Sequence, residues 1–212
     1  MFIRARSPDL WRRLVATSPR TDAFCPVMAH PTDIPSLRTA LEAGTSFDVI
    51  LFPDCGQAST PLTSSCLSQW ATTPFREGAC EFHSAEQAMM HGKALLFGDH
   101  ETAARILRTR TPFQARELGF QVRGFSEDTW IARRFDVVVR ANLPKFRENP
   151  ALAGFLLGTQ DAVLAEASPT DLVWGTGLDA LSPQASDPRR WTGLSLLGFA
   201  LMEVRARLRT SA

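Results

Sequence analysis

Apolar and polar residues between positions 84 and 98 recur with the period of an α-helix. Ser84 and Gln87 have the spacing of a capping box at its start, and Gly98 follows the last apolar residue, where a left-handed residue readily ends a helix. One face of this predicted helix carries four residues at i, i+3, i+4 and i+7, namely Glu86, Met89, Met90 and Lys93. A carboxylate and an amine therefore lie on a stripe where apolar residues are expected.

The two ionisable groups on this face could meet. A rise of about 10 Å separates Glu86 from Lys93, and helix side chains lean towards the N-terminus, so Lys93 leans back over the methionines towards Glu86. Each residue also has a simpler explanation. Glu86 would complement the helix dipole in the first turn, and Lys93 would extend its amine to water. The periodicity alone leaves both explanations open.

Caps and turn residues divide the rest of the chain into short elements. Further helices are predicted over residues 37–43, 99–107, 111–119, 126–146, 150–158 and 195–208. Strands are predicted over 47–52 and 162–167, and 75–82 has the pattern of a hairpin with a glycine at its turn. Ser195 is the predicted N-cap of the last helix. The sequence thus predicts an α+β fold that is predominantly α-helical with a small sheet.

Composition indicates a compact soluble protein. The chain has 212 residues, of which 44% are hydrophobic, and its net charge of +1 gives no general attraction to nucleic acid or an acidic membrane surface. No apolar run approaches the ~20 residues that span a bilayer, and we expect no secretory segment. The cysteines form no Cys-x-x-Cys pair and the histidines no His-Glu-x-x-His pattern. We therefore expect reduced thiols, a cytoplasmic location and no metal site.

Residues 1–45 differ from the rest of the chain. Five prolines break any long element there, and arginines outnumber acids near the N-terminus. An organelle transit peptide is also rich in arginine, but Asp9 and Asp22 argue against one. We interpret 1–45 as an N-terminal extension, packed on the core or partly mobile, and 46–212 as the functional domain.

A collinear series of short motifs extends roughly from residue 47 to residue 210. It includes Ser68-Gln69-Trp70, Ser84-Ala85-Glu86-Gln87, Val122-Arg123-Gly124-Phe125, Glu166-Ala167-Ser168-Pro169, Asp171 with Trp174-Gly175-Thr176-Gly177, Trp191-Thr192-Gly193 and Leu196-Leu197-Gly198. Together these motifs resemble the NADAR/YbiA-like family of N-glycosidases. Members of that family cut the base–ribose bond of early phosphorylated riboflavin-pathway intermediates or remove ADP-ribose from modified nucleobases. The resemblance implies one YbiA-like domain and a nucleotide-like or ADP-ribosylated substrate, with no cofactor and with nucleic-acid contact only through a modified base.

The chemistry of the N-glycosidic bond suggests roles for the candidate catalytic residues. As the bond breaks, positive charge develops on the sugar, and Glu86 could stabilise it and act as general base. Lys93 could anchor a phosphate or the leaving base as a cation, or attack C1 as a free amine and hold the opened sugar as a Schiff base. Asp171 could hold the ribose hydroxyls or share the proton transfer. The resemblance adds Gln69 as a substrate-binding residue.

Aromatic and basic residues could form the walls of such a site. Trp174 and Gly175 lie in a glycine-containing loop, where an indole could stack on a flat heterocycle and a glycine lets backbone approach a sugar or phosphate. A turn with a buried tryptophan would look the same. Trp130 is either a second stacking residue or a core residue. Arg133 and Arg134 are expected to be solvated, with phosphate contact as the alternative.

The chain departs from the family pattern at two aromatic positions. Ala71 and Ala88 stand where aromatics are usual, and the chain has no tyrosine. These losses would suit a non-catalytic ADP-ribose or nucleotide-binding module, or a structural partner protein with a vestigial pocket. Glu86 and Lys93 are nevertheless both present, and binding alone needs neither at that spacing. We therefore expect an enzyme.

Overall fold

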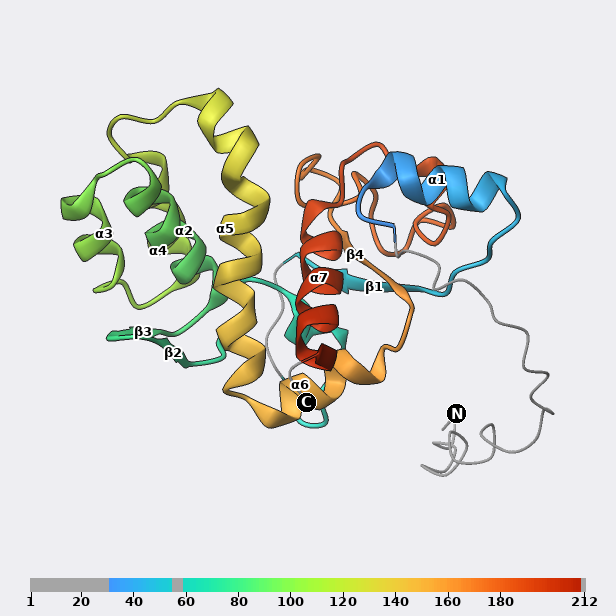
Figure 1. Ribbon diagram of the computed structural model, residues 1–212, viewed down its shortest axis with the longest axis horizontal. Helices are drawn as coiled ribbons and strands as arrows, with labels where there is room; N and C mark the ends of the chain where they lie inside the picture. Colours follow the sequence, from blue (N-terminus) through green and yellow to red (C-terminus); the bar gives the residue numbers. More distant parts are fainter. Residues whose placement is uncertain (1–30, 55–58, 211–212) are drawn as a thin grey trace, which may run out of the picture. The chain divides into compact units, whose positions relative to one another are not determined.

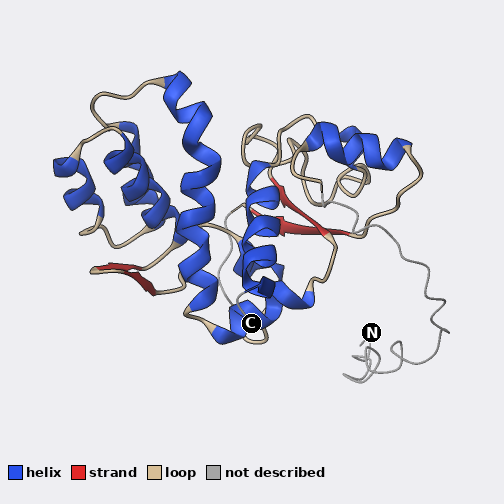
Figure 2. Ribbon diagram, in the orientation of Figure 1, coloured by secondary structure: helices blue, strands red, loops and turns tan. Residues whose placement is uncertain are grey.

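The computed structural model describes residues 31–54 and 59–210, which belong to one unit, Pro31–Ala212 (Figure 1). The elements of these ranges are, in order, α1 Ile34–Glu42, β1 Val49–Pro53, the 3-10 helix η2 Ser64–Leu67, β2 Phe75–Glu77, β3 Cys80–Phe82, α2 Ala85–Leu96, α3 His100–Ile106, α4 Pro112–Phe120, α5 Glu127–Arg147, α6 Pro150–Gly158, β4 Val163–Ala167, the 3-10 helix η3 Pro188–Arg190 and α7 Leu196–Thr210. Helices dominate, and the strands form two short pairs (Figure 2). The predicted fold class is confirmed.

Most helices begin where their caps predict. A side-chain oxygen accepts a hydrogen bond from the backbone N–H three residues further on at Ser84, Asp99, Thr111 and Ser126. Gln87 also stabilises the start of α2. Its Oε1 accepts a hydrogen bond at 2.9 Å from the N–H of His83, the residue before the N-cap Ser84. Its Nε2 donates to the Ile106 carbonyl at 2.9 Å, which ties α2 to α3.

Ser195 does not cap α7, contrary to the sequence prediction. Its φ of +51° is left-handed, whereas an N-cap residue needs extended backbone. Its buried hydroxyl hydrogen-bonds to none of the described residues. The backbone forms the connection instead: the Ser195 N–H donates to the Gly175 carbonyl at 3.0 Å, and the Phe199 N–H donates to the Ser195 carbonyl at 3.4 Å. The start of α7 is therefore joined to the loop that follows β4.

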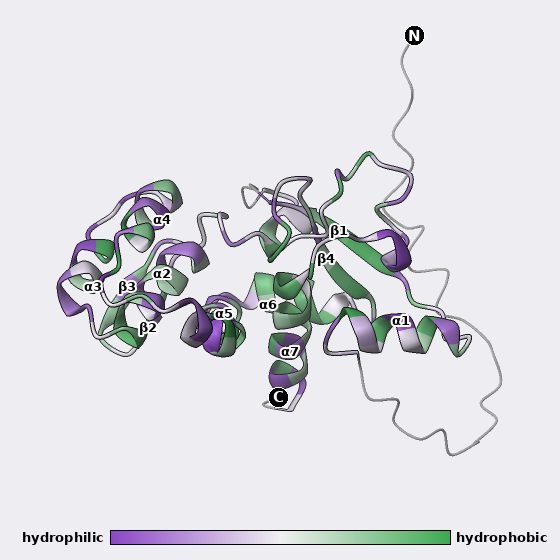
Figure 3. Cartoon of the chain, turned by 90° about the horizontal axis from the view of Figure 1, so that it is seen from above, coloured by the Kyte–Doolittle hydropathy of each residue, from purple (hydrophilic) through white to green (hydrophobic). Residues whose placement is uncertain are grey.

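β1 and β4 pair in parallel, from Val49 opposite Val163 to Pro53 opposite Ala167. The two strands are largely hydrophobic, as Figure 3 shows, and every residue of β4 is buried. Helix α7 packs against β4. A Cβ atom at Gly198 would overlap the Leu164 carbonyl, so glycine is what allows α7 to approach the strand this closely.

Helix α2 has the most contacts among the helices. It packs against α3, α4 and α5, while α5 also packs against α7 and so connects this group to the β1–β4 pair. The hairpin β2–β3, which pairs Phe75 with Phe82, directly precedes α2. Glu86 and Lys93 are both among the buried residues of α2. The polar residues that broke the expected apolar stripe are therefore inside the protein.

The helix predicted over residues 37–43 is present as α1, and its apolar side contributes to the core. Residues 1–30 and Cys55 lie outside the described residues, so the interpretation of the N-terminal extension stays a prediction. Within the described ranges, no helix is long and apolar enough to cross a bilayer. In the same part of the chain, no group of His, Cys, Asp and Glu side chains is arranged to hold a metal ion.

Candidate active site

A cavity of about 350 Å³ is lined by residues of α2, α4, α5, the end of β4 and the loop after it. Six of the seven site residues predicted from the sequence line it, namely Gln69, Glu86, Lys93, Trp130, Asp171 and Trp174. Gly175 does not line it. Its backbone pairs with Glu166, and a Cβ atom there would lie 2.9 Å from the Asp171 carbonyl oxygen. The lack of a side chain at Gly175 therefore allows close packing against the protein's own backbone, and not the predicted approach of the backbone to a sugar or phosphate.

The Glu86 carboxylate is buried at the wall of this cavity. Its side chain lies in the first turn of α2 and is 4% exposed, while its backbone N–H donates to the Gln69 carbonyl at 3.0 Å. The carboxylate accepts no hydrogen bond from any described residue. Burial raises the pKa of Glu86 to about 8; the charges of Arg116 and Lys93 oppose this rise, and that of Asp171 adds to it. Such a group could take up a proton near neutral pH.

The Lys93 amine is held by a carbonyl and by aromatic rings. Its Nζ donates to the Gly119 carbonyl at 2.9 Å and lies 4.6 Å from the ring centroid of Phe125 and 5.4 Å from that of Trp130. Burial lowers the pKa of Lys93, and the charge of Glu86 opposes this. Glu86 and Lys93 thus line the same cavity, as expected from their helix face, but they form no ion pair.

Gln69 is fixed by a buried network. Its Nε2 contacts the Met89 sulfur at 3.2 Å, and its Oε1 accepts from the Asn142 Nδ2 at 3.0 Å. The neighbouring Ser68 carbonyl accepts from the Lys145 Nζ at 2.8 Å. Asn142 and Lys145 therefore hold the segment that carries Gln69, which accounts for two polar residues on the buried side of α5.

Asp171 shapes the loop that carries Trp174. Its Oδ1 accepts from the backbone N–H groups of Val173 at 2.8 Å and of Trp174 at 2.7 Å, as in an Asx turn. Its Oδ2 has no hydrogen bond within the described chain. The indoles of Trp70, Trp130 and Trp174 all line the cavity. The acid and the indole three residues apart thus form one structural unit.

Glu166 is a cavity residue that sequence reasoning missed. It lies on β4 and is 5% exposed, and burial raises its pKa to about 8, with further increases from the charges of Asp171, Asp54 and Glu86. A signal was available, because Glu166 is the one charged residue in the otherwise apolar strand predicted over 162–167. A charge in a buried strand requires a partner or a function.

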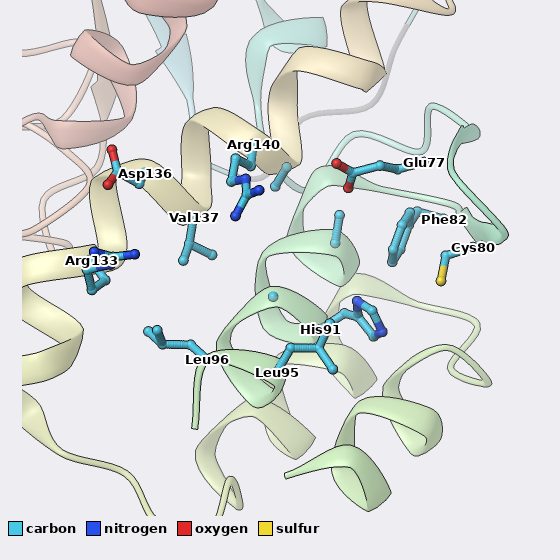
Figure 4. Close-up of a pocket in the computed structure, with 13 residues that line it drawn as sticks. Glu77, Cys80, Phe82, His91, Leu95, Leu96, Arg133, Asp136, Val137 and Arg140 are labelled. Atoms are coloured by element: carbon cyan, nitrogen blue, oxygen red, sulfur yellow. The ribbon is translucent and has the colours of Figure 1, made fainter. Parts of the chain in front are cut away.

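Two arginines also line the cavity, Arg116 from α4 and Arg134 from α5. The preceding Arg133 lines a different cavity of about 490 Å³ on the other side of α2, together with Val137 and Arg140 (Figure 4). Consecutive residues on a helix point about 100° away from each other. Of the two arginines predicted as alternative phosphate contacts, Arg134 therefore faces the candidate site and Arg133 faces the other cavity. None of the seven predicted site residues lines the larger cavity.

Comparison with known proteins identifies relatives for most of this chain. The profile of the NADAR domain matches residues 57–209. N-glycosidase R617 of Acanthamoeba polyphaga mimivirus is 39% identical over 143 residues, which are 65% of this chain and 84% of the viral protein. Protein irg-1 of Caenorhabditis elegans is 38% identical over 140 residues, which are 65% of this chain and 66% of that protein.

Two further comparisons concern a longer protein and a solved structure. The chloroplastic riboflavin biosynthesis protein PYRR of Zea mays is 38% identical over 111 residues, which are 51% of this chain but 14% of that longer protein. The NMR structure of the E. coli protein YbiA matches with a TM-score of 0.59 at 23% sequence identity, covering 79% of this chain and 88% of YbiA. At this identity the match shows that the two proteins share a fold.

Proposed function

This chain belongs to the NADAR family, and from that membership we propose that it is an N-glycosidase, a hydrolase that cleaves the bond between a base and a ribose or phosphoribose. The proposed substrates are phosphorylated riboflavin-pathway intermediates or ADP-ribosylated nucleobases. The name of the mimivirus relative, an N-glycosidase, supports the activity, and that of the maize relative, a riboflavin biosynthesis protein, supports the first of the two substrate classes. The observation that carries it is the buried Glu86 carboxylate at a cavity that also contains an amine and three indoles.

Glu86 would act on the sugar. As the C1–N bond breaks, the ribose acquires oxocarbenium-like positive charge, and an ionised carboxylate in a buried site stabilises that charge strongly. The same carboxylate could take the proton of the attacking water, since burial raises its pKa to about 8. The reaction consumes only water, so we propose no cofactor.

The other lining residues would bind the base and the anionic part of the substrate. The indoles of Trp70, Trp130 and Trp174 offer flat apolar faces for stacking. Arg116 and Arg134 provide guanidinium groups for a phosphate. The substrate would therefore be an N-glycoside with an aromatic base and at least one phosphate. We also propose a cytoplasmic location, which the scattered cysteine spacing of the sequence favours.

The test is release of base from candidate N-glycosides. Ribosylaminopyrimidine phosphates and ADP-ribosylated guanosine are incubated with the protein, and the free base is measured by liquid chromatography with mass detection. Wild type should release base from at least one of them, and Glu86→Gln should lose about 10²–10³-fold in rate. Glu117→Gln, an exposed site on α4 outside this cavity, is the control and should keep full activity. Binding without release by wild type would contradict the proposal and favour a nucleotide-binding module.

A second measurement separates the two roles open to Lys93. Contact with the Gly119 carbonyl and the Phe125 ring favours the ammonium form, whereas burial favours the free amine. Borohydride is added during turnover, and the protein mass is measured. A reduced sugar adduct on Lys93 identifies a Schiff base. Turnover without any adduct identifies a cationic anchor, and Lys93→Arg should then keep part of the activity.

A further inference from the structure

The carboxyl group of Glu166 has no part in the scheme above, although it lines the same cavity as Glu86. We propose that Glu166 is the general acid of this site, and that it gives its proton to the nitrogen of the departing base. This inference rests on the proposed N-glycosidase function. It assigns the second carboxyl group that hydrolysis of a glycosidic bond commonly requires.

The backbone holds Glu166 in a fixed position. β4 pairs Glu166 with Phe52 of β1, and the Glu166 carbonyl accepts from the Thr176 N–H at 2.9 Å. The neighbours Ala165 and Ala167 are both buried. The strand is thus paired on one side by β1 and on the other by the loop after Asp171. The Glu166 Cα is therefore fixed beside the cavity, and the burial of the side chain limits how far the carboxyl group can move.

The side chain itself has no structural partner. Glu166 is 5% exposed, yet its carboxyl group makes no hydrogen bond or ion pair with any residue that the structure describes. An ionised carboxylate buried without a partner is strongly unfavourable, so this group is stable there as the neutral acid. A neutral carboxyl group that faces a cavity can donate its proton to a ligand.

The surrounding charges distinguish the two glutamates. The ionisable groups that act on Glu166 are all carboxyl groups, those of Asp54 after β1, Asp171 in the loop and Glu86 on α2. Glu86 has cations nearby as well, Lys93 and Arg116. When the pair loses its first proton, the negative charge is therefore more stable on Glu86 and the remaining proton stays on Glu166. This is the protonation state in which one group acts as base and the other as acid.

The proposed step balances as follows. The C1–N bond breaks, its electron pair goes to the base nitrogen, and the Glu166 proton moves to that nitrogen. The oxygen of water forms the new bond to C1, and the water proton moves to the Glu86 carboxylate. Proton exchange between the two carboxyl groups through solvent then restores the starting state. If Lys93 rather than water attacks C1, the departing base needs the same proton.

The experiment compares leaving groups. An amine or amide nitrogen needs a proton to depart, whereas the pyridinium of nicotinamide mononucleotide departs as a neutral base without one. In Glu166→Gln, kcat/KM should fall about 10²–10⁴-fold on whichever ribosylaminopyrimidine phosphate or ADP-ribosylated guanosine wild type cleaves, and less than about 10-fold on nicotinamide mononucleotide. Glu86→Gln, the matched variant, should impair both reactions because both develop charge on the sugar. Equal losses on both substrates in Glu166→Gln, or no loss on either, would overturn the assignment.

A pH profile gives a second, independent result. Wild-type kcat/KM should fall on the alkaline side as the acid ionises, and Glu166→Gln should lack this fall while keeping the acidic side. If Glu166→Gln still shows the fall in kcat/KM on the alkaline side, the assignment is contradicted. This test does not use nicotinamide mononucleotide, so it applies even if wild type does not cleave that compound. Circular dichroism checks folding, and Glu166→Asp, which keeps an acidic proton, should retain part of the activity. If wild type releases no base from any substrate, it is the proposed N-glycosidase function that fails.

Discussion

Replacing Glu86 by glutamine should remove a loss of stability that wild type shows as the pH rises from about 5 to about 8. Burial raises the pKa of Glu86 from 4.5 to about 8 in the folded protein, whereas the unfolded chain keeps the ordinary value. Between these two values the unfolded state releases the proton and the folded state retains it. Raising the pH therefore favours the unfolded state, and wild-type stability should fall through this range.

The size of the effect follows from the two pKa values. Linkage gives a loss of roughly 3–4 kcal/mol in the free energy of unfolding from about pH 5 to about pH 8 for Glu86 alone. Glu86 is 4% exposed, so solvent screens its charge little. Glutamine does not titrate in this range. The stability of Glu86→Gln relative to wild type should therefore rise by about this amount over the same interval.

Urea unfolding followed by circular dichroism measures this difference at several pH values. Glu117→Gln replaces an exposed carboxylate on α4 and serves as the control, whose pH dependence should follow that of wild type. The reasoning is refuted if wild type and Glu86→Gln lose stability in parallel between pH 5 and pH 8. A stabilisation that is largest at the acidic end would refute it as well.

Two further predictions concern packing and phosphate binding. Gly198→Ala should lower the free energy of unfolding by about 3 kcal/mol or more, because its Cβ atom would overlap the Leu164 carbonyl. Gly154→Ala, in α6 with no atom within 4 Å of the new Cβ, should raise the free energy of unfolding by about 0.5–1 kcal/mol. Chemical denaturation measures both variants, and an equal change in stability for the two would contradict the packing argument. Arg116→Gln should raise KM for a phosphorylated substrate about 10-fold; a similar rise for the dephosphorylated analogue would argue against a phosphate contact.

Local signals in the sequence were sufficient for α2. The serine cap, the glycine after the last turn and the helical spacing of Glu86 and Lys93 depend on hydrogen bonds and geometry within a few residues. The same holds for the hairpin that precedes it and for the caps at Asp99 and Thr111. The acid and the amine could be placed on one helix face without knowledge of the rest of the chain.

Signals of the same kind failed where long-range contacts determine the conformation. Ser195 has the residue type of an N-cap, but hydrogen bonds to the loop after β4 hold its backbone in the left-handed region. Arg133 and Arg134 were equivalent in the sequence, and only the packing of α5 against α2 directs them to different cavities. The carbonyl that holds the Lys93 amine belongs to Gly119 on another helix.

The sequence by itself determined the helical elements of this protein and the position of Glu86 and Lys93 on one helix face, since both follow from short-range periodicity; the burial of that face depends on how α2 packs against α3, α4 and α5. The tertiary structure decided that Glu166 lies at the same cavity, because the parallel pairing of β1 with β4 joins segments more than a hundred residues apart. It also decided that burial raises the pKa of both glutamates to about 8, since desolvation depends on how the whole unit packs around them.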